Sequence, residues 1–264
     1  KDRAPELRVH AWKVCWAMDR APSNLVTRLE HQGRLQVTDT GRTHPWLCPT
    51  HPDNVELELL GIREVLQRYE VDGIHLDYIR YPDRHACYCA GCRKRFERVI
   101  GRKVANWPED VAKDSGVLTQ PYRVWRCGRI TSFVRKCRAA VERFRPEARL
   151  SAAVFGKYPS CVPSVGQDWV RWVDEGLVDF VCPMNYTEDT QVFEAYVADQ
   201  TRRLSDRAAA VVPGIGVTAT ESRLGVVDVL DQIGVLRAHG AGGFVLFDLD
   251  EYLATEILPV LPPA

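Results

Sequence analysis

The fold is decided by the stretch Val71-Asp-Gly-Ile-His-Leu-Asp-Tyr-Ile-Arg-Tyr-Pro82. Side chains alternate along a β-strand, so Gly73, His75 and Asp77 share one face, while the apolar side chains between them point toward a layer of helices. Pro82 cannot continue a ladder of hydrogen bonds, so the strand ends near this residue. Asp77 is therefore expected near the carboxyl end of a strand, where α/β barrels carry their catalytic groups.

Strand and helix patterns alternate along the rest of the chain. Strands are expected near residues 7–16, 71–81, 150–155, 178–186, 208–217 and 242–249. Helices are expected at 53–69, 91–101, 121–144, 168–175, 190–205 and 224–239, with a long irregular connection over 17–52. This alternation predicts a parallel sheet, and chemistry at the strand ends favours a barrel. We expect one α/β domain of the (β/α)8 TIM-barrel type over residues 1–264, with six of the eight βα units visible.

The composition is that of an ordinary globular protein. The chain has 264 residues, of which 45% are hydrophobic and 27% are charged. Lys plus Arg and Asp plus Glu each number 35, so the formal net charge is zero. Nothing in this balance indicates a nucleic acid or an anionic membrane as a partner. No apolar run approaches the roughly 20 residues that span a bilayer.

The cysteines indicate a metal site more than a disulfide framework. Nine cysteines cannot all pair within one chain, and three of them form Cys87-Tyr-Cys89-Ala-Gly-Cys92. Four thiolates make a closed structural zinc site, and the fourth ligand is expected to be Cys48, with His85 as the alternative. Free or disulfide-linked thiols are the competing interpretation. The other cysteines are expected to be small core hydrophobes or surface thiols, and they are Cys15, Cys127, Cys137, Cys161 and Cys182.

Five motifs resemble the glycosyl hydrolase-like 10 group of TIM-barrel proteins. They are His10-Ala-Trp12, Leu47-Cys-Pro-Thr-His-Pro52, Asp72-Gly-Ile-His-Leu-Asp-Tyr-Ile-Arg-Tyr-Pro82, Pro183-Met-Asn-Tyr186 and Gly243-Phe-Val-Leu-Phe247. The resemblance implies that the visible strands are the third to the eighth of a barrel. An open barrel would expose edge strands, so a missing N-terminal segment of a larger protein, or a partner segment, is expected to complete it. A similar cysteine element binds zinc in some β-galactosidase barrels.

The resemblance also implies hydrolysis of a glycosidic bond, which generally needs two carboxyl groups. Asp77 is the first candidate. Asp248 is the preferred second catalytic carboxylate, with Glu188 and Asp250 as alternatives. A structural ion pair of Asp77 with Arg80 or His75 is the competing interpretation.

Seven residues are predicted to bind the substrate: His10, Trp12, His75, Arg80, Asn185, Tyr186 and Glu188. The ring of Trp12 suits stacking on the apolar face of a sugar. Plain packing of His10 and Trp12, and plain support of a loop by Asn185 and Tyr186, remain alternatives. Arg80 is expected to orient Asp77 or to contact the substrate.

The chitinase-type pattern Asp-Gly-x-Asp-x-Asp-x-Glu is only partly present. Its third acid matches Asp77, but His75 stands at the second acid and Ile79 at the Glu position. The chitinase mechanism is therefore rejected. The leading prediction is a glycoside hydrolase that acts on a polysaccharide or oligosaccharide such as bacterial cell-wall glycan. The alternative is a non-catalytic carbohydrate-binding or scaffolding barrel. A metal-dependent hydrolase is disfavoured, because no pair of histidines has ligand spacing beside a carboxylate.

Overall fold

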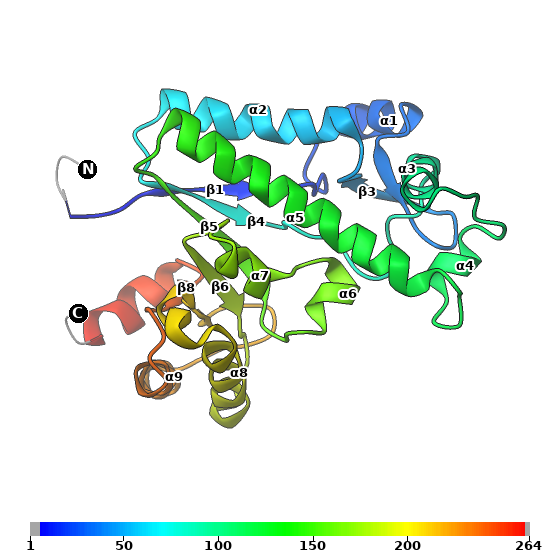
Figure 1. Cartoon of the computed structure of the whole chain (residues 1–264). Coiled ribbons are helices and arrows are strands. Elements are labelled where there is room, and N and C mark those ends of the chain that lie inside the picture. The colour runs from blue at the N-terminus through cyan, green and yellow to red at the C-terminus, as the bar shows by residue number, and fades with distance from the viewer. Residues whose placement is uncertain (1–5, 262–264) are drawn as a thin grey trace. The chain divides into compact units, whose positions relative to one another are not determined.

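The computed structural model describes residues 6–261, and the chain divides into two compact units (Figure 1). The first unit extends to Leu150 and includes Pro159–Asp168, while the second contains Ser151–Tyr158 and the chain from Trp169 onward. Strand β5 (Arg149–Phe155) begins in the first unit and continues into the second. The expectation of a single domain over residues 1–264 stays a prediction.

Two parallel strands and two long helices form the framework of the first unit. Strand β1 (His10–Val14) pairs with β4 (Gly73–Asp77) in a register that places Trp12 beside His75 and Val14 beside Asp77. Helices α2 (Pro52–Arg68) and α5 (Thr119–Phe144) lie side by side along these strands (Figure 1). The apolar side chains of β4, Ile74 and Leu76, are almost fully buried. The alternation predicted for this strand is therefore confirmed, and it leaves Asp77 on the opposite face.

Gly73 allows the two strands to come together at their starting ends. A Cβ atom at this position would lie 2.6 Å from the backbone oxygen of Arg149 and 2.6 Å from the ring of His10. Real Cβ atoms do not tolerate such contacts, so a side chain here would push the His10 ring or the next strand away. The glycine thus fixes how His10 packs beside β4.

The expectation of an irregular connection over residues 17–52 is wrong. This segment contains helix α1 (Ser23–His31) and an antiparallel pair formed by β2 (Leu35–Val37) and β3 (Thr43–Leu47). Strand β3 carries a proline and β2 has only three residues, so neither offers the repeated alternation that predicts a strand. The first unit is completed by α3 (Ala90–Ile100), α4 (Glu109–Ala112) and α6 (Cys161–Val165), of which only α3 was expected.

The second unit repeats the βα pattern. Strands β5, β6 (Phe180–Met184), β7 (Gly214–Gly216) and β8 (Val245–Phe247) are parallel and pair in chain order. The helices between them are α7 (Trp169–Asp174), α8 (Thr190–Leu204) and α9 (Val226–Ala238). Strand β7 is shorter than predicted because the 3-10 helix η1 (Ser205–Ala210) occupies part of the expected range. Two short turns, η2 (Leu253–Ile257) and η3 (Leu258–Val260), end the described chain.

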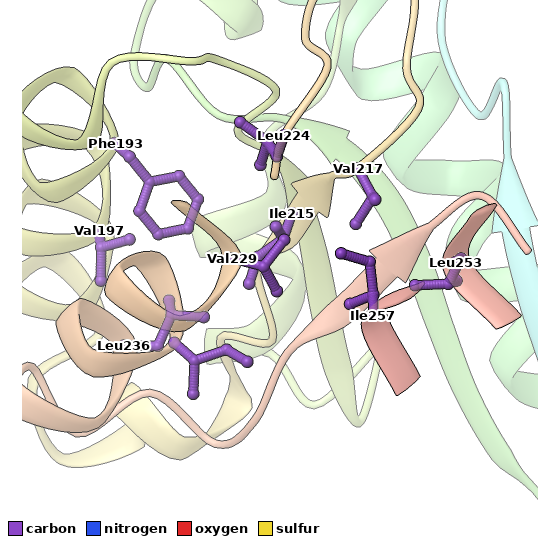
Figure 2. Close-up of a cluster of buried hydrophobic side chains, with 10 residues drawn as sticks. Phe193, Val197, Ile215, Val217, Leu224, Val229, Leu236, Leu253 and Ile257 are labelled. Carbon is purple, nitrogen blue, oxygen red and sulfur yellow. The ribbon is translucent and has the colours of Figure 1, made fainter. Parts of the chain in front are cut away.

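A compact apolar cluster holds the second unit together (Figure 2). Its side chains come from α8, from β7 and the residues after it, from α9 and from η2. They are Phe193, Val197, Ile215, Val217, Leu224, Val229, Ile233, Leu236, Leu253 and Ile257, each at most 3% exposed. Burial of one such side chain stabilises the fold by about 1.5–3 kcal/mol. The cluster explains why β7 can be short, since side chains of α8, α9 and η2 pack together with Ile215 of this strand.

Six parallel strands, each associated with helices, make this the partial (β/α)8 barrel that the sequence predicts. In such barrels the carboxyl ends of the strands carry the chemistry. Residues 6–261 contain no helix that is both long and apolar enough to cross a membrane.

Candidate active site and metal centre

Asp77 and Trp12 meet at the carboxyl ends of β4 and β1. Because Trp12 and Asp77 lie on the same face of two adjacent parallel strands, the indole can reach across to the carboxylate. The indole Nε1 donates a hydrogen bond to Asp77 Oδ2 at 3.0 Å. Trp12 is 63% exposed, so its ring face is open to a ligand while its nitrogen orients the acid.

Both strands leave the sheet through a residue in the left-handed region. Trp16 has φ 65° just beyond β1, and Tyr78 has φ 53° directly after β4. Such a conformation is uncommon for bulky residues and is found preferentially at functional sites. At β4 it is fixed locally, because the backbone N–H of Tyr78 donates to Asp77 Oδ1 at 2.7 Å. Both carboxylate oxygens of Asp77 therefore accept a hydrogen bond.

Two aromatic rings pack against Arg80 in the segment that follows Asp77. The guanidinium carbon of Arg80 lies 5.2 Å from the ring centroids of both Trp46 and Tyr78. The Trp46 indole donates to Asp19 Oδ2 at 3.0 Å. Burial lowers the pKa of Arg80 from its ordinary value, and the negative charge of Asp77 opposes that shift. Arg80 and Asp77 thus interact electrostatically, and the role of Arg80 in orienting Asp77 or contacting a substrate stays a prediction.

Sequence reasoning missed Trp46, Tyr78 and Asp19. Trp46 directly precedes the Leu47–Pro52 motif, and Tyr78 directly follows Asp77, so both stood beside segments that were already recognised. Asp19 carried no signal, because it lies in a connection with no periodic pattern.

Two histidines extend the polar face behind Asp77. Burial lowers the pKa of His75, while Asp77 opposes this effect and His10 adds to it. His75 is therefore harder to protonate than an exposed histidine. His10, His75 and Asp77 are brought together in the first unit, as the sequence predicts.

A buried carboxylate on α2 fixes the end of β1. Glu58 Oε1 accepts from the backbone N–H of Trp16 at 3.0 Å, and Glu58 Oε2 pairs with the ammonium of Lys13. Burial acts against the charge of Lys13, yet the neighbouring Cys15 and Glu58 raise its pKa overall. The pair holds β1 in register, and β1 carries Trp12.

Four cysteines form one cluster in the first unit. The Sγ atoms of Cys48, Cys87, Cys89 and Cys92 all lie within 4.8 Å of one another, and all four residues are buried. Cys48 Sγ lies 3.5 Å from Cys92 Sγ, 3.7 Å from Cys87 Sγ and 3.8 Å from Cys89 Sγ. This cluster can hold a metal ion. Its members are the four ligands that the sequence predicts.

The thiols of the cluster differ in the direction of their pKa shifts. Hydrogen bonds from the side chains of Cys48, Cys87 and Cys92 hold the pKa of Cys89 well below its usual range. Burial raises the pKa of Cys87 instead. The backbone N–H of Cys92 also points at Cys89 Sγ, over 3.4 Å, because Cys89 caps the start of α3. Thiolates, not thiols, are the form of cysteine that binds metal ions.

His85 has another partner and lies outside the cluster. Its Nδ1 lies 2.8 Å from Asp39 Oδ2. Both residues line a cavity of about 340 Å³ together with Arg84, Glu109 and Lys113. The fourth position in the cluster is filled by Cys48, so the alternative ligand is not needed. The five remaining cysteines are all buried, as expected of core thiols.

In the second unit, Asn185 is buried and paired. It is 1% exposed, and its amide makes two hydrogen bonds with Gln200, at 2.9 and 2.8 Å. Gln200 also donates to the backbone oxygen of Gly156 at 3.0 Å. These bonds tie β6 to α8 and to the end of β5.

The other predicted residues of the second unit lie near β7 and β8. Tyr186 stacks on Phe247 with ring centroids 5.2 Å apart, and Glu188 accepts from the backbone N–H of Arg223 at 3.1 Å. Asp248 directly follows β8, is exposed, and accepts from the Thr218 hydroxyl at 2.9 Å. Among the alternatives for a second carboxylate, Asp250 accepts from the backbone N–H of Leu253 at 2.8 Å, as the cap of a turn does.

The sequence profile of the glycosyl hydrolase-like 10 family matches residues 2–226. Among solved structures, the chain is similar to the PgaB (BpsB) glycoside hydrolase domain from Bordetella bronchiseptica. The TM-score is 0.74 at 15% identity, over 94% of this chain and 72% of that one. It also resembles bee venom hyaluronidase in complex with a hyaluronic acid tetramer, with a TM-score of 0.56 at 14% identity, over 94% of this chain and 85% of that one. At these identities the likeness shows the fold alone.

One curated relative is an S-layer-related protein from Niallia circulans. It is 29% identical over 133 residues, which are 47% of this chain and 8% of that protein. The chain thus spans a small part of the length of this relative.

Proposed function

The chain belongs to the glycosyl hydrolase-like 10 family, and from this premise we propose that it hydrolyses glycosidic bonds of a polysaccharide, with bacterial cell-wall glycan as the substrate to test first. One observation carries the proposal. Asp77 stands at the carboxyl end of a barrel strand with both oxygens held, beside an aromatic ring that is open to a ligand. Active sites of this fold class are built at that end of the strands.

In this proposal two carboxyl groups catalyse the hydrolysis. Glycosidases generally use one as an acid and the other as a base or nucleophile. Asp77 is one, because the bonds from Trp12 and Tyr78 fix its orientation. Asp248 is the other, since it follows β8 directly and is exposed.

The saccharide is bound by aromatic and polar side chains. The exposed ring of Trp12 stacks on the apolar face of a sugar ring. His10 on β1, His75 on β4 and Arg80 in the segment after β4 offer hydrogen bonds to the saccharide. Tyr186 and Glu188 do so in the second unit, whereas the pairing of Asn185 with Gln200 favours the role of supporting the loop.

The four-cysteine cluster holds Zn²⁺ in this proposal and serves as a structural centre. Zinc binds thiolates at about 2.3 Å in a tetrahedron, which requires sulfur–sulfur edges of about 3.8 Å. The distances of 3.5 to 3.8 Å from Cys48 to the other three thiols fit that requirement. Zinc would join Cys48, which directly follows β3, to the segment that begins α3, and would take no part in the reaction. Less than half an equivalent of zinc in the purified protein would count against this assignment.

Each of the two outer strands, β1 and β8, has one edge without a neighbouring strand among the described residues. Within residues 6–261, β1 pairs only with β4 and β8 pairs only with β7. Apolar side chains are exposed on both, including Trp12 and Phe247. Exposed edges of this kind are normally covered, so we propose that another segment of the same protein or a partner covers them.

The test is turnover of defined glycans. The protein is incubated with peptidoglycan strands, with a β-linked amino-sugar polymer and with hyaluronate, and new reducing ends are counted while products are identified by mass spectrometry. Release of shorter fragments from any of them supports the enzyme. A non-catalytic carbohydrate-binding barrel is the second candidate, because the open Trp12 ring suits binding without turnover. Saturable binding of a glycan that stays intact over days would favour that candidate instead.

A further inference from the structure

Two buried polar atoms near the cysteine cluster lack a hydrogen-bond partner among the described residues. They are the hydroxyl oxygen of Tyr81, which is 0% exposed, and Nε of Arg126, which is 2% exposed. Buried polar groups in native proteins almost always have a partner. Cys92, Cys48 and Cys87 are near enough to act electrostatically on the Tyr81 hydroxyl, and so is Arg126. Both unpaired atoms therefore belong to the surroundings of the same cluster.

Arg126 extends from α5 to the segment that leads into Cys87. Its Nη2 donates to the backbone oxygen of Asp83 at 2.8 Å and to that of Ala86. Its guanidinium carbon lies 4.3 Å from the centroid of the Tyr81 ring. A fully buried arginine without a carboxylate partner is costly, because a charge removed from water needs compensation. Among the described residues no acid forms an ion pair with Arg126, whose bonds go to neutral carbonyls.

A metal ion in the cluster supplies that compensation. Four thiolates around a divalent cation carry a net charge of about −2. A second arginine, Arg95, is connected to the cluster through the hydroxyl of Thr50. Arg95 Nη1 is 3.3 Å from the Thr50 hydroxyl, and that hydroxyl is 3.2 Å from Cys48 Sγ and 3.3 Å from Cys92 Sγ. Two buried or half-buried cations thus accompany a centre of two negative charges.

Tyr81 connects this centre to the candidate catalytic strand. It lies four residues after Asp77, and its backbone N–H donates to the oxygen of Val165 at 2.9 Å. Arg80 binds the backbone oxygens of Tyr81 and Pro82 through Nη1, at 3.1 and 3.0 Å. Whatever holds the Tyr81 side chain therefore also holds the segment that begins at Asp77.

We propose that Arg126 is the built-in counter-charge of the four-cysteine metal centre, and that Arg126 and Tyr81 together tie this centre to the segment that carries Asp77. The inference rests on the proposed zinc site. Metal binding turns the four thiols into thiolates, whose negative charge compensates the charge of Arg126 and attracts the dipole of the nearby Tyr81 hydroxyl. Zinc occupancy then fixes the residues after Asp77, so Tyr81 and Arg126 are positioning residues rather than catalytic ones.

The variants separate charge from packing. Arg126→Met removes the charge but keeps a long apolar side chain, and Arg126→Lys keeps the charge. Tyr81→Phe removes only the hydroxyl. Arg129→Met is the matched control, because Arg129 lies on the same helix, is exposed, and contacts the Trp125 ring instead.

The first measurement is zinc affinity, by competition of each purified full chain with a chromophoric chelator. Arg126→Met should weaken zinc binding at least tenfold and Tyr81→Phe about three- to tenfold. Arg126→Lys should recover part of the loss, and Arg129→Met should match the unchanged protein. If Arg126→Met fails to fold, Tyr81→Phe carries the test alone.

The second measurement is hydrogen exchange by mass spectrometry before and after zinc is removed. Removal should speed exchange in the peptide that contains residues 78–82 and leave the β7–β8 peptides unchanged. Zinc affinity that is equal in all five proteins, or an unchanged peptide 78–82, would overturn the coupling. A wild-type protein that binds no zinc would instead overturn the metal centre, and this inference with it.

Discussion

Trp12 and Asp77 are joined across two parallel strands by a hydrogen bond of 3.0 Å, from the indole nitrogen to a carboxylate oxygen. The ring that orients the acid is mostly exposed, so one residue can position Asp77 and contact a ligand at the same time. This pairing links the fold to the proposed chemistry. It also allows the two roles of Trp12 to be separated by substitution.

Trp12→Phe keeps an aromatic ring but removes the donor to Asp77. A hydrogen bond to a charged group is worth about 1.5–3 kcal/mol, so we expect kcat/KM to fall roughly 10- to 100-fold on the best substrate. Thermal stability should hardly change, because the side chain is exposed. Trp107→Phe is the control, since the Trp107 indole donates to the backbone oxygen of Tyr88 instead. Equal kinetics for both variants would remove the Trp12 bond from the mechanism.

Cys89→Ser is expected to abolish tight zinc binding. Chelation of zinc from the unchanged protein should lower its melting temperature by several degrees, because the metal binds only the folded state. In Cys89→Ser the chelator should have no further effect. Cys182→Ser makes the same change at a buried thiol in β6, outside the cluster, and should still respond to the chelator. Loss of the chelator effect in Cys182→Ser as well would show that the response does not come from the cluster.

Glu97 is expected to make the stability of the first unit depend on pH in the acid range. Hydrogen bonds from Lys103, the Val104 backbone and Arg93 lower the pKa of Glu97 from 4.5 to about 2. A carboxyl group with a lowered pKa stabilises the fold above its ordinary pKa, and this contribution is lost as the pH falls toward the folded value.

The stability advantage of the unchanged protein over Glu97→Gln should therefore be constant near neutral pH and should shrink between about pH 4.5 and 2. Urea unfolding at a series of pH values measures it. Glu109→Gln serves as an exposed control. A difference in the free energy of unfolding between the unchanged protein and Glu97→Gln that stays the same down to pH 2 would contradict the prediction.

Asn185→Ala separates support of the fold from binding of substrate. Because it removes both hydrogen bonds between Asn185 and the buried Gln200 amide, and leaves the Gln200 oxygen without this donor, we expect the free energy of unfolding to fall by about 1–3 kcal/mol. Gln191→Ala, on the exposed side of α8, should change it by less than about 0.5 kcal/mol. Chemical denaturation tests both. An Asn185→Ala protein of normal stability with a raised KM would restore Asn185 as a substrate-binding residue.

The main parts of the fold could be predicted because strong patterns mark them. The alternation of Gly73, Ile74, His75, Leu76 and Asp77 identifies a strand with one apolar face, and that face is buried as expected. The spacing of Cys87, Cys89 and Cys92 is typical of a metal site, and the predicted fourth thiol, Cys48, lies 44 residues before Cys92 along the chain. Alternating apolar side chains are typical of a strand with one buried face, and closely spaced cysteines are typical of a metal site, so both patterns could be interpreted from the sequence.

Other parts depend on tertiary contacts that leave no trace in a local pattern. The short strands β2 and β3 pair with each other only after the chain has turned between them. Neither shows an alternation of apolar and polar residues long enough to predict a strand. Asp19 joins the site because Trp46 reaches it from β3. Glu58 looked like any surface acid of a helix, yet it holds the backbone of Trp16 from a buried position.

The central claim is that Asp77 is a catalytic carboxylate. The most direct test is Asp77→Asn, which keeps the size of the side chain, assayed on glycan strands beside the unchanged protein with equal zinc content and equal melting temperature. The account predicts that release of reducing ends falls at least a thousandfold while glycan binding persists. Turnover equal to that of the unchanged protein would contradict it.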